Sequence, residues 1–189
     1  ETNDALKEVY GTTIEALQTA FDQKVEKQYA SIRAALKRPD INEKASVDEL
    51  KALAEANPGS FAVQMQLGVA LEEAGDHAAA ITAMERASKL IPAANGDNNP
   101  NKLIAAIALE QKDTERAIQA LEALVRVDHS DVESARRLAS LVAPLGDRAR
   151  TEDAWRRVVA IDPFDSAAQT ELGRLALARK DTEAALRAF

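Results

Sequence analysis

The side chains that most often carry out chemistry in proteins are sparse or scattered in this sequence. Its two histidines, His77 and His129, lie far apart along the chain, and it has no cysteine. A zinc site needs three or four converging ligands. Carboxylates are numerous, but acid–base catalysis would need them buried in an apolar pocket, and we expect them to be solvated on helix surfaces. Gly-rich phosphate loops and G-x-S-x-G motifs are absent. We therefore predict no metal site, no cofactor and no catalytic residue, so this chain is not expected to be an enzyme.

The composition is that of a folded, mildly acidic protein. The 189 residues are 46% hydrophobic and 29% charged, with a formal net charge of −7. That charge disfavours nucleic acid as a partner, because phosphates need a positive surface. No apolar run approaches the ~20 residues of a membrane span. The absence of cysteine suits a cytoplasmic or a periplasmic protein, so the compartment stays open. The chain begins at Glu1 without a methionine, so we expect its natural start to lie upstream.

Two ladders of residues recur along the chain with nearly the same period. Asp76, Asp113, Asp147 and Asp181 are separated by 37, 34 and 34 residues, and Pro58, Pro92, His129 and Pro163 by 34, 37 and 34. Between successive members lie two apolar patterns with helical spacing, separated by a turn. Both ladders indicate an insertion of three residues after Pro92, in the Asn-rich stretch 93–101. The chain is therefore predicted to be a stack of helix–turn–helix units.

These units resemble the tetratricopeptide repeat. The first carries, at the family's spacing, Leu67-Gly68, Leu71, Gly75-Asp76, Ala80, Met84, Ala87 and Pro92; the last carries Leu172-Gly173, Ala176, Asp181, Ala185 and Phe189. The family's first aromatic is replaced in every unit, by Gln64, Asn101, Ala135 and Gln169. The resemblance implies an all-α fold, a right-handed α–α superhelix. It would comprise an N-terminal helical segment (1–45), a half repeat (46–58) and four repeats (59–189), of which the last is incomplete.

The same resemblance implies a concave groove, lined by the first helix of each repeat, that binds a protein or peptide. The repeat register places six candidate binding residues in it: Met65, Val69, Lys102, Arg136, Arg137 and Arg174. The four basic residues would form one wall suited to an acidic peptide, because arginine pairs well with carboxylates. Alternatively, they are ordinary solvated charges. The predicted function is a protein–protein interaction module or scaffold.

The N-terminal segment predicts a short helix that ends at Gly11, followed by a long helix to about Lys37. Thr12 and Glu15 match a capping box. Apolar residues follow at steps of three and four: Ile14, Leu17, Phe21, Val25, Tyr29, Ile32 and Leu36. We expect this stripe to pack on the repeats, with a coiled-coil seam as the alternative. A second capping box, at Ser46 and Glu49, opens the half repeat.

The N-terminal segment also bears a weaker resemblance, through its helix, Gly-Thr-Thr and second helix, to the end of the catalytic domain of bacterial gluzincin-type zinc peptidases. This resemblance gives the alternative function, the non-catalytic repeat region of a larger enzyme. The H-E-x-x-H motif is absent, so no peptidase residue is implied. At the other end, we expect self-association through an apolar C-terminal face formed by Leu177, Ala185, Leu186 and Phe189.

Overall fold

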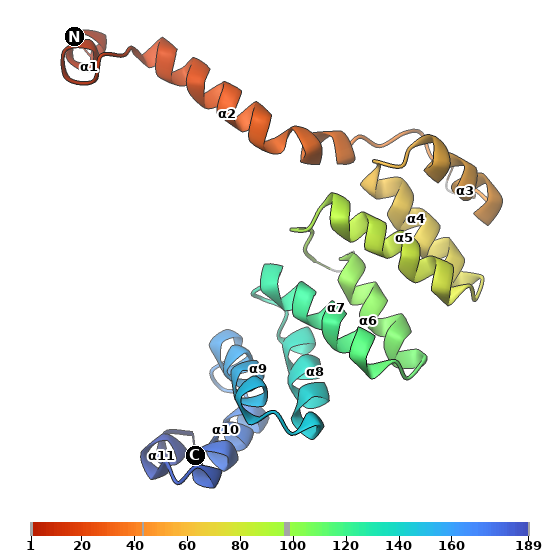
Figure 1. Cartoon of the computed structure of the whole chain (residues 1–189), viewed down its shortest axis with the longest axis vertical. Helices are drawn as coiled ribbons and strands as arrows, with labels where there is room; N and C mark the ends of the chain where they lie inside the picture. The colour runs from red at the N-terminus through yellow and green to blue at the C-terminus, as the bar shows by residue number, and fades with distance from the viewer. Residues whose placement is uncertain (1, 43, 97–98, 189) are drawn as a thin grey trace.

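The computed structural model describes residues 2–42, 44–96 and 99–188, and the regular elements of these residues are all helices (Figure 1). They are α1 (Thr2–Tyr10), α2 (Ile14–Ala35), α3 (Val47–Ala56), α4 (Phe61–Glu73), α5 (His77–Leu90), α6 (Pro100–Glu110), α7 (Thr114–Val127), α8 (Val132–Val142), the 3-10 turn η1 (Ala143–Leu145), α9 (Arg148–Ile161), α10 (Ser166–Ala178) and α11 (Thr182–Ala188). From α3 onward the helices stack in chain order as a right-handed α–α superhelix, which confirms the predicted fold class.

Four helical hairpins make up the superhelix: α4–α5, α6–α7, α8–α9 and α10–α11. The periodic aspartates cap the second helix of each hairpin. Asp76, Asp113, Asp147 and Asp181 each accept a hydrogen bond from the backbone N–H three residues ahead. Such a bond satisfies one of the free donors at a helix start. The ladder that revealed the repeats is thus a ladder of N-caps.

The residue before each of these aspartates has a left-handed backbone. Gly75 and Gly146 have φ of +79° and +82°, and Lys112 and Lys180 stand at the equivalent positions with φ of +60° and +63°. This conformation ends a helix, and glycine adopts it at no steric cost. The two lysines hold it against the clash of their Cβ atoms.

One continuous core runs through the stack, from Leu50 in α3 to Ala168 in α10. Met84 and Trp155, at the aromatic position of the second helix, belong to it. Gly68 allows α4 to approach α5: a Cβ at this position would lie 2.8 Å from Cγ of Met84. The two helices of the first repeat therefore approach each other closely at Gly68. Gly173 is buried in α10.

The insertion lies in the connection between α5 and α6. That connection spans residues 91–99, whereas the α3–α4, α7–α8 and α9–α10 connections have four residues each. Asn99 is buried at its end, where its side chain accepts from the backbone N–H of Asn101 at 2.8 Å and donates to the carbonyl of Ala94. Asp97 and Asn98, within the predicted insertion, lie outside the described residues.

Pro144 lies in η1, directly after α8. Proline has no backbone N–H and its ring clashes with the preceding turn, so α8 ends early at this position.

The long N-terminal helix does not pack on the repeats along its length, so our expectation is wrong there. Helix α2 projects away from the stack (Figure 1), and Ala35, in its last turn, is its buried residue. The side chains of Leu17, Phe21 and Tyr29 are exposed, Phe21 by 62%. The apolar spacing indicated that this face packs against a partner, but it did not identify the partner.

The two capping boxes have different outcomes. Ser46 and Glu49 form the complete box at the start of α3. At α2, the cap is Thr13 rather than Thr12, and its hydroxyl accepts from the N–H of Ala16. Glu15 does not complete a box with Thr12 but binds Asn3 of α1. The amide oxygen of Asn3 accepts from the N–H of Ile14, and its amide nitrogen donates to Glu15. A contact between helices replaces the local box.

Candidate partner-binding groove

A surface pocket of about 630 Å³ opens between α6, α7 and α8, on the side of the stack formed by the first helices of the second and third repeats. Its lining is Lys102, Ala105, Ala106, Leu109, Glu110, Leu121, Glu133, Ser134 and Arg137. Its lining combines short or apolar side chains with charged ones. The sequence placed Lys102 and Arg137 in a groove, and the pocket brings these two residues together.

Arg137 is the cation of this pocket best placed to meet a ligand. Its side chain is exposed, and it makes no ion pair with any residue that the structure describes. Lys102 lies on the facing helix, and its Nζ is 3.1 Å from Asp131. Glu110 and Glu133 also line the pocket, so its charges are balanced rather than uniformly basic. The repeat register did not place these two carboxylates in the groove.

Arg136 lies beside Arg137 in sequence, but it does not line this pocket and instead binds residues at the start of the fourth repeat. Its guanidinium pairs with Asp165, the N-cap of α10, and lies 3.3 Å from Asp162. The hydrogen bond that Arg136 donates to Asp165 raises the pKa of Arg136. The pKa of Asp165 is lowered first by the backbone N–H of Ala168 and then by Arg136. Arg136 is therefore occupied at the junction between the third and fourth repeats.

The remaining candidates lie outside this pocket. Arg174 pairs at 2.8 Å with Glu171, three residues earlier in α10. Met65 is half-buried and Val69 is 38% exposed, and both belong to α4, whereas the pocket is formed by α6, α7 and α8. The four basic residues predicted to form one wall thus lie in three separate arrangements: a pocket, a repeat junction and a surface pair.

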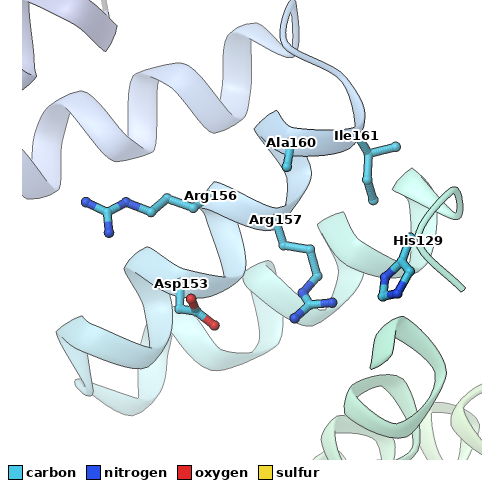
Figure 2. A pocket seen from close by; sticks show the side chains of 6 residues that line it. All are labelled: His129, Asp153, Arg156, Arg157, Ala160 and Ile161. Carbon is cyan, nitrogen blue, oxygen red and sulfur yellow. The ribbon is translucent and has the colours of Figure 1, made fainter. Parts of the chain in front are cut away.

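A second pocket, of about 430 Å³, lies on α9 next to the α7–α8 connection, and the sequence did not single it out. It is lined by His129, Asp153, Arg156, Arg157, Ala160 and Ile161 (Figure 2). Figure 2 shows Arg156 directed away from His129, and Arg156 pairs with Glu152 at 2.5 Å. Arg157 donates to the carbonyl of Val125 at 2.6 Å and so ties α9 to α7. Both arginines already bind other groups of this chain. We therefore interpret this pocket as part of the packing between helices rather than as a binding site.

Among residues 2–42, 44–96 and 99–188, no three histidine, aspartate or glutamate side chains gather as a metal site would require. Nor does any helix described there have the length and apolar character to cross a membrane.

At the C-terminal face, Leu177 and Leu186 are exposed, but Ala185 is buried, contrary to our expectation. Ala185 follows the cap Asp181 by four residues, the position at which Ala80 and Ala117 of the first two repeats are also buried. Phe189 lies outside the described residues.

Comparison with known proteins supports the repeat assignment. Residues 44–98 match the tetratricopeptide repeat family. Among solved structures, the crystal structure of MamA has a TM-score of 0.52 and 15% identity, covering 76% of this chain and 82% of that one. MamA AMB-1 has a TM-score of 0.54 and 16% identity, with coverages of 93% and 89%. YrrB, titled a TPR protein with an unusual peptide-binding site, has a TM-score of 0.51 and 16% identity, with coverages of 98% and 87%.

These likenesses show that the chain has the fold of a tetratricopeptide repeat superhelix. No curated protein sequence matches the chain. The family match begins at residue 44, so it does not reach the segment that resembles a peptidase, and that resemblance stays a prediction. The division into segments 1–45, 46–58 and 59–189 likewise stays a prediction.

Proposed function

We propose that this chain is a protein–protein interaction module whose concave pocket between α6 and α8 binds a peptide segment of a partner protein. The repeat-family match and the superhelical fold support the class of function, since such stacks present extended concave surfaces. Among solved proteins of this fold, YrrB is titled as having a peptide-binding site. The pocket beside Arg137, which forms no ion pair with a described residue, is the observation that carries the proposal.

The lining of the pocket indicates the chemistry of the ligand. Ala105, Ala106, Leu109 and Leu121 provide apolar surface for a side chain of the peptide, which would act as its anchor. Arg137 offers a fork of donors to a carboxylate next to that anchor. Glu110 and Glu133 would repel a run of acidic residues. The ligand we propose therefore has one apolar residue beside one acidic residue, rather than an acidic tail.

The six residues predicted from the register receive unequal roles in this proposal. Arg137 and Lys102 contact the ligand, with Lys102 contributing its alkyl chain and part of its charge alongside Asp131. Met65 and Val69 would extend the surface toward α4 for a longer peptide, and Arg174 would extend it toward α10. Arg136 would support the groove from the repeat junction. Exposed charge pairs contribute about 0–1 kcal/mol each, so we expect a dissociation constant on the order of micromolar.

A peptide library displayed on beads or phage tests the proposal. Wild-type protein should select sequences in which an apolar residue and an Asp or Glu are close together. Arg137→Glu should abolish the acidic preference and weaken binding roughly tenfold, because it replaces an attraction by a repulsion of similar size. Leu109→Asp should remove the apolar preference. The matched control is Arg148→Glu, which makes the same charge change at an exposed position of α9 that is not part of the pocket.

Arg136 should not be substituted in this test, because its loss would disturb the junction with the fourth repeat. Equal capture of the same peptides by wild type, Arg137→Glu and Leu109→Asp would contradict the proposal. So would an equal loss of binding in Arg148→Glu, since that result would indicate only a long-range effect of net charge.

A further inference from the structure

The exposed apolar face of α2 has no counterpart elsewhere in the described chain. It consists of six residues of α2 and of Leu36, the residue that follows its last turn. We call these seven the α2 stripe: Ile14, Leu17, Phe21, Val25, Tyr29, Ile32 and Leu36. Five of them are exposed, including Phe21 by 62% and Leu36 by 60%, and Val25 and Ile32 are half-buried. Val9 and Tyr10 at the end of α1 are exposed as well. An apolar surface of this length on a projecting helix indicates an interface.

The geometry of the α2 stripe suits another straight helix. At 100° per residue, its members fall within about 120° of the helix circumference. Ile14, Val25 and Leu36 follow one another at intervals of eleven residues. Eleven residues make about three helical turns, so these three side chains lie nearly in line. The stripe therefore runs nearly parallel to the helix axis over the 22 residues of α2, a length of about 33 Å.

The α2 stripe is also nearly symmetric when its direction is reversed. Phe21 and Tyr29 each lie four residues from Val25, and Ile14 and Leu36 each lie eleven residues from it. Two copies of α2 placed antiparallel about Val25 would bring Phe21 of one opposite Tyr29 of the other, and Ile14 opposite Leu36. A two-fold interface requires this kind of self-complementarity.

The distribution of charge along α2 also favours an antiparallel pair. Residues 14–23 contain Glu15 and Asp22 and no basic residue, a net charge of −2. Residues 24–35 contain Lys24, Lys27 and Arg33 against Glu26, a net charge of 3 − 1 = +2. An antiparallel pair places each acidic half against a basic half, whereas a parallel pair in register stacks halves of like charge.

From these observations we propose that α2 pairs with α2 of a second copy of this chain, antiparallel and centred on Val25, to form a dimer. The repeats then lie at opposite ends of the paired helices, because each superhelix begins after the C-terminus of its own α2 (Figure 1). The pocket between α6 and α8 stays open in such a dimer. One dimer would thus present two peptide-binding pockets and gain avidity for a partner that carries two peptide segments.

The first test is the mass in solution, measured by light scattering after size exclusion at about 100 μM, a concentration at which a micromolar dimer is assembled. We expect twice the chain mass of 20.4 kDa. Leu17→Ser/Phe21→Ser should give the monomer. Gln23→Ser/Ala30→Ser, which makes two changes on the opposite face of α2, should leave the dimer intact. Leu177→Ser/Leu186→Ser should also leave it intact, which distinguishes α2 from the C-terminal face.

The second test measures the direction of pairing and uses the absence of native cysteine. Phe21→Cys and Tyr29→Cys chains, mixed and mildly oxidised, should form the mixed disulfide in preference to either self-linked species. A parallel pair would instead link Phe21→Cys to itself. Circular dichroism of each variant confirms that the helical content is unchanged.

Two results would overturn the proposal: a wild-type monomer at about 100 μM, or a dimer that survives Leu17→Ser/Phe21→Ser. Preferential self-linkage of Phe21→Cys would overturn the antiparallel arrangement. Peptide capture by the Leu17→Ser/Phe21→Ser monomer should persist for a peptide with a single binding segment. The dimer and the peptide-binding function can therefore fail independently.

Discussion

Arg136 in α8 pairs with Asp165, the residue that caps the N-terminus of α10. The preceding junction has an equivalent contact: Lys102 in α6 lies 3.1 Å from Asp131, the N-cap of α8. In both pairs the cation precedes the aspartate by 29 residues. A basic residue on the first helix of one repeat thus holds the capping residue of the next. Two of the four residues of the predicted basic wall join repeats to each other.

Replacing Arg136 should loosen the junction between the third and fourth repeats. Arg136→Ala removes the partner of a largely buried carboxylate, so the free energy of unfolding should fall. Arg137→Ala, at the neighbouring and exposed position, is the matched control and should leave stability nearly unchanged. Urea unfolding followed by circular dichroism compares the two. Equal stability of both variants would show that the junction pair contributes nothing.

The same junction should respond to pH. The pKa of Asp165 is lowered by the N–H of Ala168 and by Arg136, so the folded state holds this carboxylate ionised more strongly than the unfolded chain does. Its contribution to stability is therefore fully present above the unfolded pKa of about 3.9 and is lost as pH falls through the lower folded pKa.

Asp165→Asn isolates this effect, because asparagine can still cap the helix but carries no charge. The melting temperature of the wild type should exceed that of Asp165→Asn at neutral pH, and the difference should shrink as pH falls below about 4. A difference that stays constant across this range would assign the effect to the shape of the side chain rather than to its charge.

Gly68 offers a direct test of packing within the first repeat. A side chain there would meet Met84, so Gly68→Leu should overpack the contact between α4 and α5 and cost about 1–3 kcal/mol or more. Gly59→Leu is the control: a Cβ at Gly59 would meet no atom within 4 Å. Thermal unfolding should separate the two variants. Gly68→Leu/Met84→Ala should recover part of the loss, since the smaller residue vacates the contact.

The left-handed lysines predict a stabilising substitution. Lys112 has the same turn position as Gly75 and Gly146, so Lys112→Gly should relieve the strain of a positive φ and stabilise the chain by up to about 1 kcal/mol. Lys51→Gly, in the exposed part of α3, should do the opposite and destabilise by about 1 kcal/mol. The melting temperatures of the two variants should therefore move in opposite directions. A decrease for Lys112→Gly would mean that its side chain contributes more than the strain costs.

The sequence by itself determined the features that depend on neighbours along the chain. The aspartate ladder located the helix starts, because a capping hydrogen bond spans only three residues. The spacing of apolar residues predicted the helices and their buried faces from α3 onward. Gly68 was recognisable because a small residue recurs at the position where two helices of a repeat approach each other. Each of these signals acts within one repeat.

Only the tertiary structure decided which side chains meet across repeats and which apolar face stays open. Arg136 and Arg137 are equivalent in type and adjacent in sequence, yet their side chains diverge by about 100° around α8. One therefore reaches Asp165, and the other lines the pocket. The stripe of α2 has the periodicity of a buried face, but the superhelix turns away from it after residue 35. Periodicity shows that a face needs covering, whereas the path of the chain through space decides what is near enough to cover it.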